Sequence, residues 1–210
     1  MKIFIQTIVT SFLLFGCKSS FVDVRDGHKY KTVRIGKQVW LAENFSFKAD
    51  SGCWAYKDSI KFSKEFGFLY NLETAQKICP KGWRLPTASD YEDLMRKVYQ
   101  GKTTDMKYGG KLFYRLVVRK DDGYIFPSFL KWHKSGFSVR LAGSTSKLSD
   151  ASPREFTGMR DGKGFYCFGT SNFWCLNSET FYVYSNFMGS GAMISLGTPE
   201  NGYSVRYIKE

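Results

Sequence analysis

The sequence predicts an α+β fold in one domain, with two early helices followed by short, mostly antiparallel strands and long loops. Apolar residues follow helical spacing on both sides of residues 79–87, CPKGWRLPT. After residue 100 the apolar runs are short and are separated by turn-forming residues, which is typical of strands. Since no Pro/Gly/Ser-rich linker or internal repeat divides residues 23–210, we expect a single domain there.

The two helices are predicted from their capping residues. Asn71 is a suitable N-cap for a helix over residues 72–78. Thr87 is a suitable N-cap for a second helix over residues 88–99, and Asp90 completes a capping box with it. The apolar residues of the second helix recur every three or four positions, so this helix is expected to bury one face.

Strands are expected before and after the helices. Residues 23–42 are predicted to form a β-hairpin, with a two-residue loop at Gly36 and Lys37. The segments 165–168 and 173–176 are expected to pair as a second hairpin around Gly169. Further strands are predicted over residues 112–118, 136–143, 181–184, 193–196 and 203–209.

The N-terminus has the pattern of an export signal. Residues 1–16 combine one lysine, a short apolar run and a small residue before Cys17, which fits a secretory signal peptide. Residues 14–17, LFGC, resemble a bacterial lipobox, so Cys17 is the predicted lipidation site and residues 17–22 the tether. The protein is then an exported lipoprotein held on a membrane through Cys17, at the outer membrane or cell surface of a Gram-negative bacterium. The alternative is an ordinary signal peptide with an incidental cysteine.

The chain is basic, with a net charge of +12. Between Arg96 and Arg140 there are 11 Lys/Arg against three Asp. Such a segment favours acidic polysaccharide or acidic lipid, whereas no nucleic-acid-binding motif accompanies it. We therefore expect no nucleic-acid partner, and the alternative is a solvated face without any partner.

Several motifs together resemble one known family. They are YKTVRIGKQVWLAEN at residues 30–44, FGFLY at 66–70, CPKGWRLPT at 79–87, GFS at 136–138, FW at 173–174 and SVR at 204–206. In this order they resemble the Fibrobacter succinogenes major paralogous domain family of bacterial surface and secreted proteins. That family is similar in turn to the C-type-lectin-like fold, including formylglycine-generating domains. The resemblance implies that the N- and C-terminal strands pair with each other.

The cysteines depart from the family pattern. The resemblance implies bridges from Cys53 to position 63 and from Cys79 to position 207, but this chain has Ser63 and Tyr207 there. The two cysteines left without partners suggest a Cys53–Cys79 bridge. The second expected bridge, Cys167–Cys175, would clip the hairpin around Gly169. Free buried thiols are the alternative.

Catalytic and metal-binding motifs are weak. The closely spaced cysteine pair of the formylglycine-generating branch has no counterpart, and neither histidine lies beside an obvious nucleophile. The order of Pro199-Glu200-Asn201 does not match the calcium motif of lectins, and it is predicted to be a turn. We therefore expect no enzyme, no metal and no cofactor.

Exposed aromatic rings are the remaining candidates for binding. Rings stack on sugar faces and anchor protein interfaces, and the predicted ligand-binding residues are Trp132, Trp174, Tyr182 and Tyr184. The alternative for each ring is a place in the core. The predicted function is a non-enzymatic cell-envelope lipoprotein that presents a recognition surface for glycan or protein. The alternative is a structural or assembly component of the envelope without a small ligand.

Overall fold

The computed structural model of the chain describes residues 19–56, 59–99, 104–108, 111–116, 135–137, 139, 144–145, 165–166, 170–186 and 189–210. Its helices are α1 (Ile60–Phe66), α2 (Leu72–Lys77) and α3 (Ala88–Tyr99). The strands before α3 are β1 (Ser20–Val22), β2 (Lys29–Ile35), β3 (Gln38–Leu41), β4 (Cys53–Trp54), β5 (Leu69–Tyr70) and β6 (Trp83–Arg84). Those after it are β7 (Thr104–Tyr108), β8 (Lys111–Leu116), β9 (Ser144–Thr145), β10 (Phe165–Tyr166), β11 (Thr170–Trp174), β12 (Glu179–Asn186), β13 (Gly189–Leu196) and β14 (Ile208–Lys209).

Both predicted helices are present and begin at the predicted caps. The Asn71 side chain accepts a hydrogen bond from the Thr74 amide at 2.9 Å and so caps α2. At α3 the Thr87 hydroxyl accepts from the Asp90 amide at 3.1 Å, while the Asp90 carboxylate accepts from the Thr87 amide at 2.7 Å. This reciprocal pair is the predicted capping box.

Helix α1 is a further element that the sequence analysis missed. Its N-cap, Ser59, is a preferred residue type for this position, but it makes no side-chain capping bond, and the first turn has no acidic residue that would complete a capping box. The helix ends at Gly67, whose backbone has a φ of 76°. A Cβ at Gly67 would lie 2.6 Å from the Phe45 carbonyl oxygen, so the backbone there requires glycine.

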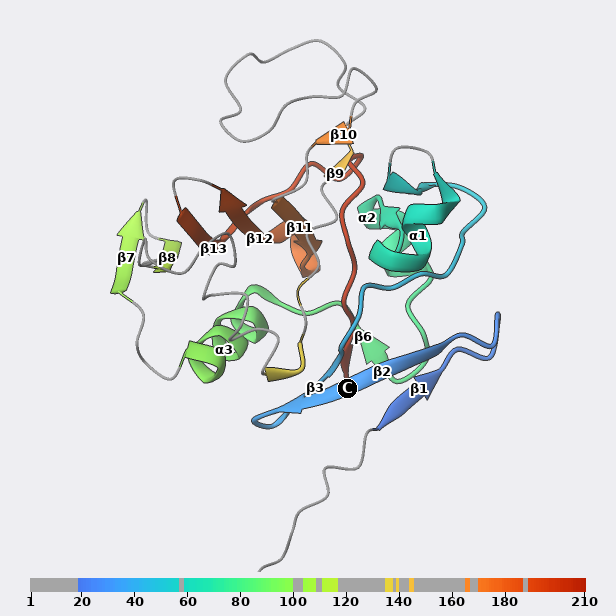
Figure 1. The fold of residues 1–210 in the computed structure, drawn as a ribbon, viewed down its shortest axis with the longest axis horizontal. Helices are drawn as coiled ribbons and strands as arrows, with labels where there is room; N and C mark the ends of the chain where they lie inside the picture. Colours follow the sequence, from blue (N-terminus) through green and yellow to red (C-terminus); the bar gives the residue numbers. More distant parts are fainter. Residues whose placement is uncertain are drawn as a thin grey trace, which may run out of the picture.

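The first sheet joins the two ends of the domain. Its strand order is β1-β2-β3-β14-β6, and Ile208 of β14 lies opposite both Trp40 of β3 and Arg84 of β6. The pairing of N- and C-terminal strands is thereby confirmed, as is the β2–β3 hairpin with Gly36 at a φ of 61° (Figure 1).

Part of the segment predicted to be a tether, residues 17–22, is a strand. Residues 20–22, which were assigned to it, form the edge strand β1 and pair with residues 29–31 of β2. Phe21 explains this pairing, because its ring packs against two core rings. The centroid of the Phe21 ring lies 6.0 Å from that of Tyr30 and 5.2 Å from that of Trp83. The first strand of the described residues therefore begins at Ser20.

The second sheet is formed by the later strands. Its order is β11-β12-β13-β8-β7, all neighbouring pairs being antiparallel. The predicted hairpin around Gly169 is wrong: β10 pairs with β9, whereas β11 pairs with β12. Three of the four pairs in this sheet join consecutive strands, whereas the β13–β8 pair joins segments more than 70 residues apart, which periodicity in the sequence does not encode.

The described residues form a small hydrophobic cluster around Tyr56 and Leu69 and two large ones. One contains Tyr91, Leu94 and Met95 of α3, which pack against β12; the other surrounds α2. Successive residues alternate between the clusters: Trp40 belongs to the first and Leu41 to the second, and Phe173 and Trp174 divide in the same way. Because side chains on a strand point alternately to opposite faces, β3 and β11 contribute to both clusters.

Candidate ligand-binding site

Trp174 is not available to a ligand. Its side chain is fully buried, and its indole Nε1 donates to the Tyr70 carbonyl oxygen at 2.6 Å. Its ring also lies 4.7 Å from that of Tyr203. The prediction that Trp174 binds a ligand is therefore wrong, because β11 turns this ring into the cluster around α2.

The other predicted aromatic residues have different outcomes. Tyr182 lies on β12 opposite Met193 and is half-buried, between the buried Phe181 and Val183. Tyr184 continues the same strand, with its side chain outside the described part. Trp132 lies outside the described residues altogether, as do Cys17 and most of the basic segment 96–140 beyond α3. The described residues thus do not join these four rings into one surface.

The predicted Cys53–Cys79 bridge is not formed in the structure. Both residues are free thiols. Cys53 lies opposite Tyr70, just before α2, whereas Cys79 follows the other end of the helix. A six-residue helix rises about 9 Å, which exceeds the Cα–Cα separation of up to about 7 Å that a disulfide bridges.

Burial disfavours the thiolate form of the described cysteines. Burial raises the pKa of Cys53 to about 11 and that of Cys79 to about 12. The Cys79 Sγ donates to the Trp83 carbonyl oxygen at 3.0 Å. Cys175 is a buried free thiol whose pKa is also raised by burial, and its expected partner Cys167 lies outside the described residues.

Tyr207 takes over part of the role that the family pattern gives to a cysteine. Its buried hydroxyl donates to the carbonyl oxygen of Ala75, one of the last carbonyls of α2. Carbonyls at a helix C-terminus lack partners within the helix, so this bond satisfies one of them. A hydrogen bond thus ties the C-terminal segment to α2 where the family pattern implies a Cys79 disulfide.

A polar pocket of about 290 Å³ lies at the start of α2. It is lined by Asn71, Leu72, Glu73, Gln76, Ser178, Pro199 and Glu200. Two of its walls are joined directly, since the Leu72 amide donates to the Pro199 carbonyl oxygen at 3.0 Å. The predicted turn before the last segment is present here, with the Asn201 amide bonded to the Thr198 carbonyl oxygen at 2.9 Å.

The third wall of this pocket has an unusual backbone. Asn177 and Ser178 both have a positive φ, 63° and 62°, which is rare for residues other than glycine. The Ser178 carbonyl accepts from the Gly197 amide at 2.8 Å, which helps to hold this conformation. Strained backbone of this kind is concentrated at functional sites, so it draws attention to the pocket.

The groups in the polar pocket suit a ligand rich in hydroxyls. Glu73, Gln76 and Glu200 are exposed, and they offer two carboxylates and one amide at the surface. Carboxylates accept hydrogen bonds, whereas an amide both donates and accepts. Among the described residues, no group of three His, Cys, Asp or Glu is placed to hold a metal ion.

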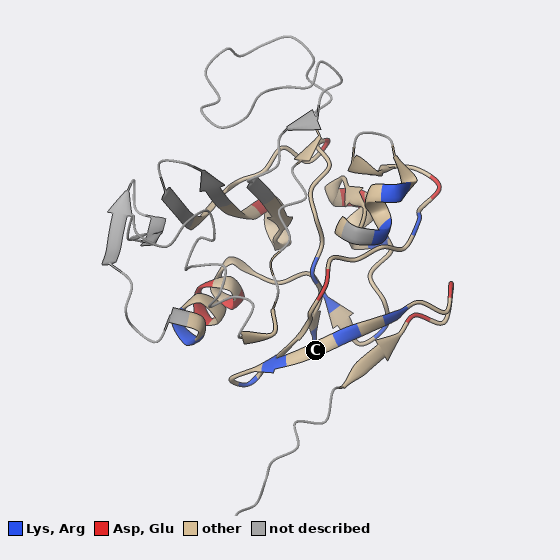
Figure 2. Ribbon diagram, viewed as in Figure 1, with Lys and Arg blue, Asp and Glu red and all other residues tan. Residues whose placement is uncertain are grey.

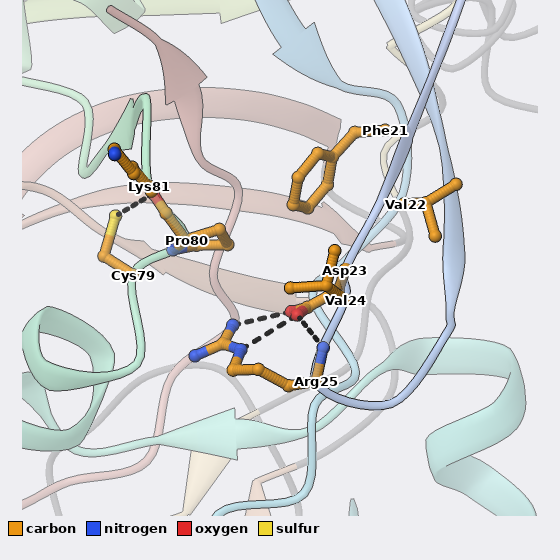
Figure 3. A pocket seen from close by; sticks show the side chains of 8 residues that line it. All are labelled: Phe21, Val22, Asp23, Val24, Arg25, Cys79, Pro80 and Lys81. Atoms are coloured by element: carbon orange, nitrogen blue, oxygen red, sulfur yellow. Dashed lines mark hydrogen bonds and ion pairs between the residues drawn. The ribbon is translucent and has the colours of Figure 1, made fainter.

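A second pocket, of about 390 Å³, lies beside β1. Figure 3 shows residues 21–25 on one side of it and residues 79–81 on the other. The Arg25 guanidinium stabilises the turn after β1. It forms an ion pair with the Asp23 carboxylate at 2.6 Å and donates a hydrogen bond to the Ile78 carbonyl oxygen at 2.9 Å. Its central carbon also lies 4.2 Å from the centre of the Phe47 ring. The hydrogen bonds from Arg25 hold the pKa of Asp23 below its usual value.

Charge is unevenly distributed over the described residues. Lys and Arg recur along β2 and the β2–β3 turn, at Lys29, Lys31, Arg34 and Lys37 (Figure 2). The polar pocket, by contrast, is lined by two negatively charged residues, Glu73 and Glu200. The positive charges along β2 and the acidic pocket therefore belong to different parts of the fold.

Several motif residues converge on a buried arginine. Arg206 is fully buried, donates through Nε to Asn44 at 2.9 Å and donates through Nη1 to the Phe137 carbonyl oxygen. Its guanidinium carbon lies 4.6 Å from the centre of the Phe137 ring and 5.7 Å from that of Phe173. Four separate motifs therefore meet in one network, which supports the scaffold rather than a surface.

The fold defines an α+β domain whose N- and C-terminal strands share one sheet and whose motif residues meet at Arg206. A family model of the Fibrobacter succinogenes major domain matches residues 33–209, and the chain belongs to this family. The resemblance of the motifs to that family is thereby confirmed. No curated protein and no solved structure matches the chain.

Proposed function

We propose that this protein is a non-enzymatic lipoprotein of the bacterial cell envelope, and that its domain binds a neutral saccharide in the polar pocket. The observation that carries the binding role is the set of carboxylate and amide groups of Glu73, Gln76 and Glu200 around one pocket. The walls are held by the Leu72–Pro199 backbone bond, so the groups belong to a fixed scaffold. Because the backbone segments are already in place, a ligand would have to order only the side chains, which limits the entropic cost of binding.

The ligand class follows from charge. Glu73 and Glu200 repel acidic groups, whereas they accept hydrogen bonds from sugar hydroxyls. A neutral glycan is therefore favoured at this pocket over an acidic one. Binding through hydrogen bonds at short range weakens little as salt rises, in contrast to attraction by a basic segment.

The anchor and the finer fold class belong to the same proposal. The LFGC motif at residues 14–17 supports lipidation of Cys17 and export to the envelope. A C-type-lectin-like arrangement is supported by the β3–β14 pairing and by α2 and α3 lying between these strands in the chain. No helix among the described residues is long and apolar enough to cross a membrane.

The binding proposal is tested by titrating the purified mature protein with neutral and acidic glycans. Glu200→Gln removes a charge-assisted acceptor and should weaken neutral glycan binding by roughly tenfold or more. Gln76→Ala should also weaken it, whereas Asp93→Asn, which changes an exposed carboxylate on α3, should not. A chelator should have no effect on the affinity.

The outcomes separate the alternatives. Equal affinity of the parent and both pocket variants would exclude the polar pocket as the site. If no glycan class binds, the protein is better described as a structural or assembly component of the envelope. Binding that disappears at high salt in the parent would point to nonspecific charge attraction instead.

A further inference from the structure

Strand β1 lies very close in the chain to the predicted anchor. It begins at Ser20, three residues after Cys17, and an extended chain spans about 3.5 Å per residue. An acylated Cys17 would therefore hold the start of β1 within roughly 10 Å of the bilayer surface. β1 is the edge of its sheet, and no other strand in the described part of the chain pairs with its outer side.

Apolar side chains are exposed at this position. Val22 is 48% exposed and Val24 is 94% exposed. Both valines line the apolar pocket beside β1, together with Phe21 and Pro80 (Figure 3). Exposed aliphatic groups that adjoin an apolar pocket are typical of a surface that meets a partner or a membrane. The Asp23–Arg25 pair and the Arg25–Ile78 bond hold the turn that presents Val24.

Positive charges surround these valines. Lys29 lies opposite Val22 and Lys31 opposite Ser20 in the β1–β2 ladder, and both are exposed. The exposed Lys81 lines the pocket from its other side. Three acidic residues lie near these lysines: Asp23 is buried and paired with Arg25, Asp26 is exposed in the connecting turn, and Glu43 accepts a hydrogen bond from the Lys31 amide at 2.8 Å. The three lysines thus exceed Asp26 and Glu43 by one positive charge. Lysines near a bilayer attract anionic lipid headgroups, each strengthening binding by about fivefold.

We propose that this surface docks on the phospholipid bilayer that carries the anchor, with the two valines inserted among the headgroups. We call it the β1 face, and its residues are Val22, Val24, Lys29, Lys31 and Lys81. The inference rests on the proposed anchoring at Cys17, which brings the β1 face to the membrane. Docking gives the domain a fixed orientation, whereas an anchor alone leaves it free to rotate.

The experiment uses the mature full-length protein, purified from membranes and reconstituted into vesicles of phosphatidylcholine, with or without phosphatidylglycerol. Amide hydrogen exchange is followed in peptides that cover residues 20–27. On the anionic vesicles, exchange in the parent should be slowed by roughly tenfold relative to Val24→Asp, because a buried charge opposes insertion. Leu196→Asp makes the same change at an aliphatic residue that is 75% exposed on β13, and it should leave the protection intact.

The same sample tests the anchor separately, since the mass of the N-terminal peptide reports acylation of Cys17. An acylated parent that exchanges as fast as Val24→Asp would overturn docking and leave the anchor standing. An unacylated protein that still binds vesicles and protects residues 20–27 would retain docking and reject the anchor. An unacylated protein that does not bind vesicles would overturn both the anchor and docking. Equal protection of residues 20–27 on vesicles with and without phosphatidylglycerol would overturn the role of the lysines.

Discussion

Arg206 and Asn44 are 162 residues apart in the chain, yet the Arg206 Nε donates to the Asn44 Oδ1 at 2.9 Å in the buried centre of the domain. Asn44 is itself held by a bond from its Nδ2 to the Phe66 carbonyl oxygen at 2.8 Å. The pair therefore ties the segment after β3 to the C-terminal segment and to the end of α1. A buried guanidinium keeps its charge only when such partners are present.

Arg206→Met should destabilise the domain by about 3 kcal/mol, because Asn44 and the Phe137 carbonyl lose a charged hydrogen-bond donor. The free energy of unfolding in urea measures this loss. Lys209→Met removes an exposed cation from β14 and is the matched control, expected to change stability by less than about 0.5 kcal/mol. Similar stabilities of the two variants would contradict the structural role of Arg206.

Tyr207→Phe should lower stability by about 1 kcal/mol, since it removes the hydroxyl that donates to the Ala75 carbonyl while it keeps the ring. Chemical denaturation of the parent and the variant gives the difference. Amide exchange near the C-terminus of α2 should become faster in the variant. An unchanged free energy of unfolding would show that this bond does not hold the C-terminal segment to α2.

Asp90→Asn should make stability less dependent on pH under acidic conditions. Burial opposes the charged form of Asp90, but hydrogen bonds from Arg84 and Thr87 outweigh it, and the pKa of Asp90 is lowered on folding. A lowered pKa in the folded state adds stability above the unfolded pKa, and this stability is lost as the pH falls through the folded value. The parent should therefore exceed the variant in unfolding free energy at pH 7, and the gap should close from about pH 5 downward.

The thiols should react slowly in the native protein. With a pKa of about 12, the thiol of Cys79 is roughly one part in ten thousand ionised at pH 8, and the thiolate is the reactive form. Peptide mapping after alkylation should find Cys53 and Cys79 unmodified in the folded protein and both labelled after denaturation. A peptide that links Cys53 to Cys79 would contradict the free thiols of the structure.

The sequence predicted those elements whose signals are local. Asn71 and Thr87 predicted where α2 and α3 begin. A helix N-cap is a hydrogen bond between residues three apart in the chain, so it can be recognised from a short stretch of sequence. Gly36 placed the β2–β3 turn for the same reason. Helix α1 and strand β1 were missed, since neither α1's N-cap nor the three residues of β1 has a strong local pattern.

The candidate site was predicted less well. Aromatic type alone does not tell a core ring from an exposed one, and Trp174 proved to be buried against Tyr70 and Tyr203. The polar pocket combines the start of α2 with the turn at residues 198–201, more than 120 residues later in the chain. No spacing rule connects two such segments, so only the folded chain brings Glu73 and Glu200 to one pocket.

By itself the sequence determined the family, the α+β class, the two capped helices and the terminal strand pairing that the family motifs imply. Caps, turns and motifs act over a few residues, and their chemistry can be read without knowledge of the fold. The tertiary structure decided the partners of β10 and β11, the burial of Trp174, the separation of Cys53 from Cys79 and the pairing of β1 with β2. These features depend on which distant segments pack together, and that is settled by the burial of the whole chain's apolar surface rather than by any one segment of it.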